Sequence, residues 1–224
     1  MPIQIAIDGP VGAGKTTISK EAAKRLGFLY MDTGALYRAI GVYCILNDID
    51  SNNEKAVNAV LEKIKLEIRL SAGEQLIYVN NVDVTDRLRM PAVSMIASQV
   101  SSYGQVREFL LDLQRGFAEK NNIIMDGRDI GTVILPNADV KIFLWADPKE
   151  RANRRFIELK EKGSPVTFEE VFEDLKKRDA NDSTRSHAPL KQAADAIKLD
   201  TTHNTFEQSI DLVVETIKNK LGMK

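Results

Sequence analysis

The sequence of 224 residues is long enough for one domain with a modest insertion, and its hydrophobic content of 43% provides for a substantial core. Its 31 basic and 32 acidic residues leave a net charge of −1, which excludes a general electrostatic attraction to nucleic acid or to an anionic membrane. The single cysteine, Cys44, excludes an internal disulfide, and the lack of a signal peptide or of an apolar run of about 18 residues predicts a cytoplasmic protein.

The segment Ile3–Ser19 reads as a strand, a glycine-rich loop and the start of a helix. The loop has the pattern G-x-x-x-x-G-K-T, in which main-chain N–H groups and the helix N-terminus surround phosphate oxygens. A glycine-rich turn with an accidental lysine is the alternative, but the strand before and the helix after argue against it. The pattern predicts a nucleoside triphosphate site, expected to bind ATP, formed by Gly9, Pro10, Val11, Gly12, Ala13, Gly14, Lys15, Thr16 and Thr17. We expect Lys15 to bridge the outer phosphates and the Thr16 hydroxyl to bind Mg²⁺ directly.

Apolar periodicity gives the remaining elements. Strands are predicted at 28–31, 66–70, 76–79, 82–84, 122–125, 140–145 and 196–200. Helices are predicted at 15–26, 56–61, 91–120, 167–184 and 205–221. Two further helices are predicted to begin after a cap at Asp32 or Thr33 and at Pro148. The three consecutive strands between 66 and 84, with a turn at 71–74, interrupt the β/α alternation and indicate an inserted antiparallel sheet.

The strand at 122–125 runs into Asp126-Gly127-Arg128-Asp129. Ligands bind at the carboxyl ends of strands in sheets of this class, and an acidic group there can hold Mg²⁺ through water. Asp126 and Asp129 both suit that position, and the sequence does not decide between them.

Several arginines lie at the ends of predicted elements or in local clusters: Arg38, Arg128, Arg151, Arg155, Arg178 and Arg185. Taken individually, these arginines can be solvated surface charges. Arg178, Asp182 and Arg185 can be a series of salt bridges along one helix, an intrahelical ladder. Together with the loop they suit phosphoryl transfer, because many cations must converge on the phosphates and guanidinium groups grip phosphate bidentately. Two helices joined by a break at 163–166 suit a lid that excludes water.

Other nucleotide-binding classes fit less well. The sequence has neither the guanine-reading pattern Asn-Lys-x-Asp nor an Asp-x-x-Gly after the second apolar strand, as a GTPase would. Motor and transport ATPases are much longer. A non-catalytic ATP-binding regulatory protein remains the alternative from a different class, and the abundance of arginine argues against it.

With these residues assembled, the chain resembles the bacterial cytidylate kinases over essentially its whole length. The matching segments are 7–16, 31–38, 97–100 with 106–107, 126–132 and 177–185, and the insert after residue 64 is similar to the bacterial branch. The resemblance implies an α/β fold with a P-loop-type parallel sheet flanked by helices, a small antiparallel insert and a helical lid. It implies one domain: a core (1–34, 121–147 and 186–224), a nucleoside monophosphate-binding region (35–120) and a lid (148–185).

The resemblance also implies an activity, the transfer of the γ-phosphoryl group of ATP to CMP or dCMP with Mg²⁺. Another base preference is the alternative within the class. We expect a monomer whose partners are these small molecules rather than nucleic acid or membrane.

Roles follow from the matching positions. The catalytic residues implied are Lys15, Arg128, Arg151 and Arg155. The cytosine edge would be read by Ser98, Arg107 and Asp129. The acceptor phosphate would be held by Arg38 and Arg128 with Thr33 nearby, and the ribose and phosphate by Arg178, Asp182 and Arg185. Mg²⁺ would be bound by Thr16 and, through water, by Asp126.

Overall fold

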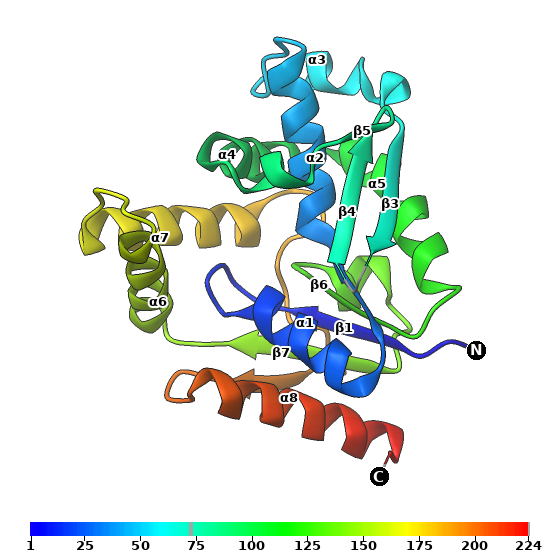
Figure 1. Ribbon diagram of the computed structural model, residues 1–224, viewed down its shortest axis with the longest axis vertical. Helices are drawn as coiled ribbons and strands as arrows, with labels where there is room; N and C mark the ends of the chain where they lie inside the picture. The colour runs from blue at the N-terminus through cyan, green and yellow to red at the C-terminus, as the bar shows by residue number, and fades with distance from the viewer. Residues whose placement is uncertain (72–73, 224) are drawn as a thin grey trace.

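The computed structural model describes residues 1–71 and 74–223 and is built on a parallel five-stranded sheet (Figure 1). The strand order is β2-β6-β1-β7-β8. The strands are β1 (Gln4–Asp8), β2 (Leu29–Asp32), β6 (Ile123–Gly127), β7 (Val140–Trp145) and β8 (Ile197–Asp200). Because β1 pairs with β6 in parallel, Asp8 and Gly127 lie side by side at the carboxyl edge of the sheet.

Helices cover both faces of this sheet, as the alternation of β1 dictates. Ile5 and Ile7 pack with side chains of α1 (Lys15–Leu26) and α8 (Phe206–Leu221) in one apolar cluster. Ala6 packs on the other face with the end of α5 (Gly104–Ala118). Successive strand residues point to opposite faces, so a strand that is apolar throughout becomes buried on both.

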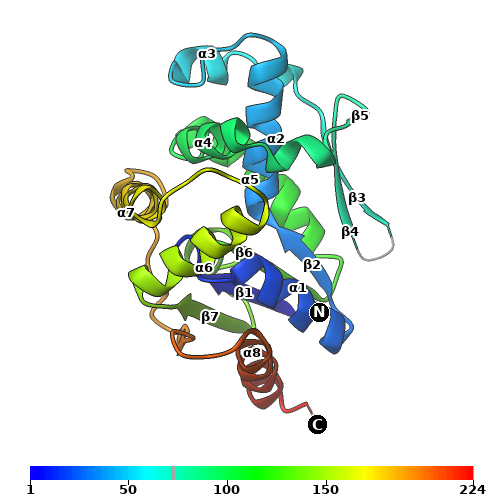
Figure 2. The ribbon, with the colours of Figure 1, turned by 60° about the vertical axis from the view of Figure 1, so that its left-hand side comes forward.

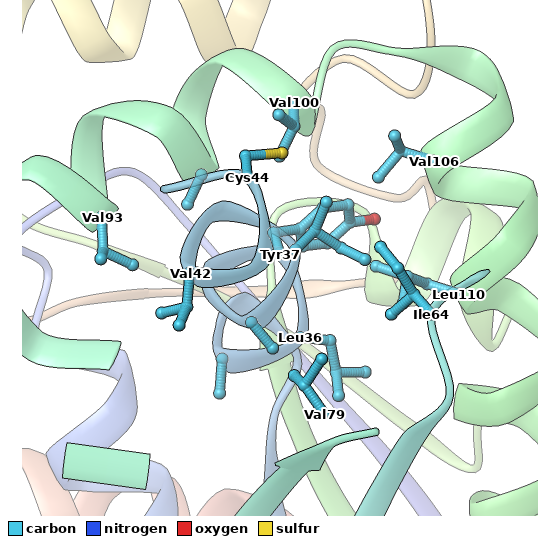
Figure 3. Packing of buried hydrophobic residues seen from close by; sticks show 14 of the residues in the cluster. Leu36, Tyr37, Val42, Cys44, Ile64, Val79, Val93, Val100, Val106 and Leu110 are labelled. Atoms are coloured by element: carbon cyan, nitrogen blue, oxygen red, sulfur yellow. The ribbon is translucent and has the colours of Figure 1, made fainter. Parts of the chain in front are cut away.

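A second apolar core surrounds α2 (Thr33–Leu46), which rises from the end of β2 (Figure 3). The helix is apolar on most sides, which suits its burial, and Cys44 is fully buried within it, whereas Ile45 and Leu46 at its C-terminal end are exposed. Its neighbours are α3 (Glu54–Asn58), α4 (Pro91–Val100), α5 and the antiparallel sheet of β3 (Leu66–Ser71), β4 (Glu74–Val79) and β5 (Val82–Asp83). The predicted insert is therefore confirmed, while residues 72 and 73 of its predicted turn lie outside the described residues.

The segment predicted to be helical, 91–120, consists of two helices, α4 and α5, which are separated at residues 101–103. Between them Tyr103 turns into the core, and its hydroxyl donates to the carbonyl of Ser51 over 2.8 Å. The predicted helix at 56–61 is likewise α3 followed by a short 3₁₀ turn (Leu61–Lys63). A second 3₁₀ helix (Thr85–Arg89) and a π-helical turn (Ile130–Ile134) have no apolar period long enough to be predicted.

Two further helices, α6 (Pro148–Glu161) and α7 (Phe168–Thr184), pack on each other beyond the carboxyl end of β7 (Figures 1 and 2). Asp147 caps α6, as predicted, and Thr167 with Glu170 forms a capping box at the start of α7. The predicted α/β class with a parallel sheet is thus confirmed. Within residues 1–71 and 74–223, none of the helices combines the length and apolarity that a membrane span requires.

Candidate functional site

The glycine-rich loop lies between β1 and α1 and is shaped by close backbone contacts. A Cβ on Gly9 would lie 2.1 Å from the carbonyl oxygen of Leu144. Gly12 and Gly14 have φ angles of 74° and 82°, which favour glycine, and Gly14 is the N-cap of α1. These constraints leave the loop free of bulky side chains at the helix N-terminus.

Lys15 folds back across this loop. Its ammonium donates to the carbonyl of Pro10 over 2.7 Å and is buried. Burial, and then the nearby guanidinium of Arg128, lower the pKa of Lys15 to about 7. An anion placed here would offset both effects, so the charge distribution of the loop suits a phosphate.

Asp126, at the end of β6, connects the loop to β2 and α2. Its carboxylate accepts from the Thr16 hydroxyl over 3.2 Å and from the Tyr30 hydroxyl over 2.7 Å, while its carbonyl accepts from Thr33 over 2.8 Å. Burial and the neighbouring Asp32 carboxylate raise the pKa of Asp126 to about 6. The predicted residues Thr16, Thr33 and Asp126 are therefore in direct contact.

The residues after Asp126 form ion pairs with α5 and α7. Arg128 donates to Asp182 over 2.6 Å, and Asp129 pairs with Arg107 and, at 3.4 Å, with Arg185. Asp182 and Arg185 thus pair across elements instead of forming the intrahelical ladder. A cavity of about 220 Å³ beside them is lined by Ser98, Gln99, Ser102, Asn181, Asp182, Thr184 and Arg185. Six of the nine predicted acceptor-site residues, excluding Thr33, Arg38 and Arg178, belong to this network or cavity lining.

Arg151 joins the helical pair to the loop. Its guanidinium donates to the carbonyls of Ala146 and Val11 over 2.9 and 2.7 Å, and it pairs with Asp179 of α7 at 2.7 Å. Asp179 also accepts from the main-chain N–H of Val11 over 3.3 Å. Both helices are therefore tied to the candidate phosphate loop.

Three other predicted arginines lie at the periphery of this network. Arg155 is half exposed and pairs with Glu158 of its own helix at 2.6 Å. Arg178 approaches Asp174 at 3.9 Å. Arg38 pairs with Asp32, the N-cap of α2. Arg155 forms no hydrogen bond or ion pair with the loop among the described residues. Thr16 and Thr17, in the first turn of α1 after the loop, are exposed.

Sequence reasoning missed four residues that contact this site: Asp8, which accepts from the main-chain N–H of Ile130, Tyr30, which donates to Asp126, Gln75, which bonds to the main chain of Asp32, and Asp179, which pairs with Arg151. Asp8 ends a buried strand, which was a usable signal, because a carboxylate in that position needs partners. Tyr30 reads as one more apolar strand residue. Gln75 and Asp179 act through contacts between distant segments, for which a single sequence has no local signal.

The model of the cytidylate kinase family matches residues 5–219. The chain is 49% identical to the cytidylate kinase of Caldicellulosiruptor saccharolyticus, covering 98% of this chain and 97% of that one. It is 48% identical to the cytidylate kinase of Shouchella clausii, covering 96% and 95%.

Solved structures share the fold at low identity. An uncharacterized protein from Eubacterium ventriosum has a TM-score of 0.53 and 15% identity, with 98% of this chain and 99% of that chain covered. A shikimate kinase from Bacteroides thetaiotaomicron has a TM-score of 0.50 and 14% identity, with 99% of each chain covered. By its sequence over nearly its full length, the chain belongs to the cytidylate kinase family.

Proposed function

We propose that the chain transfers the γ-phosphoryl group of ATP to CMP or dCMP, with ADP and CDP or dCDP as products. The observation that carries the proposal is an array of charged groups in a member of this family. Lys15 lies within electrostatic reach of Asp126 and Arg128. Arg128 pairs with Asp182, and Asp129 pairs with Arg107 and Arg185. One end of the array is a phosphate-binding loop. The other end adjoins a cavity lined by Ser98, Asp182 and Arg185.

The donor end would hold ATP through residues 9–17, with Lys15 against the outer phosphates. Thr16 and Asp126 offer hydroxyl and carboxylate oxygens, which are the hard ligands that Mg²⁺ prefers. We propose that Thr16 binds Mg²⁺ directly and Asp126 through water. When bound, the ion would offset phosphate charge.

The acceptor end would hold the monophosphate. We propose that Arg38 and Arg128 bind its phosphate, with Thr33 beside them, and that Arg178, Asp182 and Arg185 contact the ribose and phosphate. Since Arg38 and Arg128 already pair with Asp32 and Asp182, their orientation is set before the ligand arrives. A guanidinium has five N–H donors, so it can bind a phosphate while keeping its carboxylate partner.

Base recognition follows from hydrogen-bond polarity. Asp129 can accept from the exocyclic amine of cytosine, and Arg107 can donate to its ring acceptors. Uracil presents a carbonyl where cytosine has the amine, so an acceptor would face an acceptor. An unpaired buried acceptor costs about 1–3 kcal/mol, which predicts a preference for CMP over UMP.

The reaction needs positioning and charge compensation rather than covalent catalysis. An oxygen of the acceptor phosphate forms a bond to the γ-phosphorus as the bond to the bridging oxygen of ADP breaks. No general base is required, because the acceptor phosphate is already ionised. Arg128, Arg151 and Arg155 would compensate the charge on the transferred group, and α6 and α7 would exclude water.

The same proposal assigns regions and setting. We propose that residues 148–185 act as a lid, 35–120 as the monophosphate-binding region, and 1–34, 121–147 and 186–224 as the core of one domain. We further propose a monomeric enzyme of pyrimidine metabolism that works in the cytoplasm.

An ADP-release assay over CMP, dCMP, UMP, AMP and GMP tests the activity. We expect fast release with CMP and dCMP, slower release with UMP, and background rates with the purine nucleotides. ATP binding without ADP release for any of the five acceptors would contradict the proposal and favour a regulatory ATP-binding protein.

A further inference from the structure

The inserted sheet reaches back to the edge of the parallel sheet through one side chain. Gln75, next to the first residue of β4, accepts from the main-chain N–H of Asp32 over 2.8 Å and donates to its carbonyl over 3.3 Å. Both views place this end of β4 beside β2 (Figures 1 and 2). The amide of Gln75 thus bonds to the main chain of Asp32 as a neighbouring strand would.

This contact falls at a point where the parallel sheet offers a free edge. β2 is the edge strand and pairs on its inner side with β6, where Asp32 lies opposite Asp126. Gln75 engages the main-chain donor and acceptor of Asp32 that an edge residue otherwise leaves to water. Asp32 is therefore fixed between the core sheet and the insert.

The side chain of Asp32 connects this fixed main chain to the first turns of α2. One carboxylate oxygen accepts from the N–H of Ala35 over 3.1 Å and the other pairs with Arg38. Gly34 leaves room for the pair, because a Cβ there would lie 3.0 Å from Asp32 Oδ1 and 3.3 Å from Arg38 Nη1. Moving the main chain of Asp32 would consequently move Arg38.

We infer that Gln75 is a positioning residue of the acceptor-phosphate site, which acts through Asp32 on Arg38. The inference rests on the proposed function, in which Arg38 binds the phosphate of CMP. It gives the antiparallel insert a task in catalysis, which is to hold the first turn of α2 in register with the end of β6. Gln75 itself touches no substrate.

Substitution of Gln75 by Leu tests this role, because Leu has a similar size and neither donor nor acceptor. Loss of two hydrogen bonds at a partly exposed site should raise the KM for CMP about fivefold. The KM for ATP, the kcat and the ratio of kcat/KM for CMP over UMP should stay within twofold of the wild-type values. Neither the loop nor the proposed base-reading residues depend on Gln75. General destabilisation would instead lower kcat and leave KM unchanged.

Glu74→Gln is the matched control. Glu74 is the first residue of β4 and forms an ion pair with Lys20. The pair is exposed, with side-chain exposures of 60% for Glu74 and 41% for Lys20, and it does not involve Asp32. An exposed pair of this kind contributes little, so the control should match the wild type in all constants. A second variant, Gln75→Glu, keeps the acceptor for the N–H of Asp32 but places a carboxylate oxygen against its carbonyl, so it should raise the KM for CMP at least as much as Gln75→Leu.

A double-mutant cycle with Arg38→Ala identifies the route. If Gln75 acts through Arg38, the substitution Gln75→Leu should change the KM for CMP less than twofold in the Arg38→Ala background. An unchanged KM in Gln75→Leu, or the same fivefold rise in both backgrounds, would overturn the inference. If the wild type and Glu74→Gln both fail to phosphorylate CMP, the proposed function itself fails, so the two failures are distinguishable.

Discussion

The carboxylate of Asp8 accepts a hydrogen bond of 2.8 Å from the main-chain N–H of Gly131, 123 positions further along the chain. Its other oxygen accepts from the N–H of Ile130 over 2.8 Å. Asp8 immediately precedes the candidate phosphate loop, and Ile130 immediately follows Asp129, so one buried carboxylate joins the two ends of the candidate site. Asp8 is only 4% exposed.

This arrangement predicts a pH-dependent stability. Burial raises the pKa of Asp8 from its ordinary 3.8 to about 6, against the two hydrogen bonds that lower it. Between these values the folded protein keeps a proton that the unfolded chain has released, so the stability from this group is lost as pH rises through 6. Relative to Asp8→Asn, the wild type should lose about 2 kcal/mol of unfolding free energy from about pH 4 to pH 7. Urea unfolding at both pH values measures it, and a pH-independent difference would contradict the prediction.

ATP binding should take up a proton at Lys15. Its pKa of about 7 in the free protein means that much of it is neutral at about pH 8, and the phosphates should restore the charged form. Calorimetry in two buffers of different ionisation enthalpy measures the uptake, which should approach one proton per ATP. Lys15→Arg is the control, because arginine stays protonated. Equal binding enthalpies of the wild type in both buffers would rule out this uptake.

Lys15→Ala should reduce turnover by about 10³-fold or more, because the outer phosphates lose their fixed cation. The melting temperature should not fall, since the ammonium makes one hydrogen bond, of 2.7 Å to the Pro10 carbonyl, and its burial costs free energy. Turnover assays measure the loss of activity, and thermal unfolding measures the melting temperature. A variant that unfolds would show that the lysine has a structural task instead.

Asp129→Asn should weaken base discrimination. The amide can donate to the carbonyl that uracil presents, so the ratio of kcat/KM for CMP over UMP should fall about 10- to 100-fold. Asp112→Asn, on the exposed side of α5, is the control and should leave the ratio unchanged. An unaltered ratio in Asp129→Asn would remove this residue from base recognition.

Substitutions of Arg151 and Arg155, both proposed to act on the transferred group, should differ in their effect on stability. Arg151 is 2% exposed with three partners, so Arg151→Ala should cost about 3 kcal/mol of unfolding free energy and leave Asp179 with only its hydrogen bond from the main-chain N–H of Val11. Arg155 pairs with Glu158 at the surface, so Arg155→Ala should change stability by less than about 0.5 kcal/mol while lowering kcat. Denaturant unfolding and steady-state kinetics on both variants provide the measurement, and equal losses of stability would contradict the contrast.

The sequence predicted the architecture well because its strong signals are local. The strand–loop–helix of the phosphate loop, the period-two segments after residue 64 and the Asp147 cap each depend on neighbouring residues. The break between α4, which ends at Val100, and α5, whose N-cap is Tyr103, was missed because the buried side chain of Tyr103 continues the apolar pattern of a helix.

The candidate site was predictable as a set of residue types, not as a set of pairs. The spacing of Asp182 and Arg185 suggested partners on one helix, whereas their partners are Arg128 and Asp129. Gln75 has no distinguishing pattern at all. Such contacts arise from the tertiary arrangement, which brings together residues that no local period relates.

The central claim is direct transfer between two nucleotides held in one site. Incubation of the full chain with CMP and ATP carrying a labelled γ-phosphoryl group tests it most directly. The account predicts that the label appears in the β-phosphoryl group of CDP, in proportion to the ADP formed. Label released as inorganic phosphate, with CMP left unchanged, would contradict it.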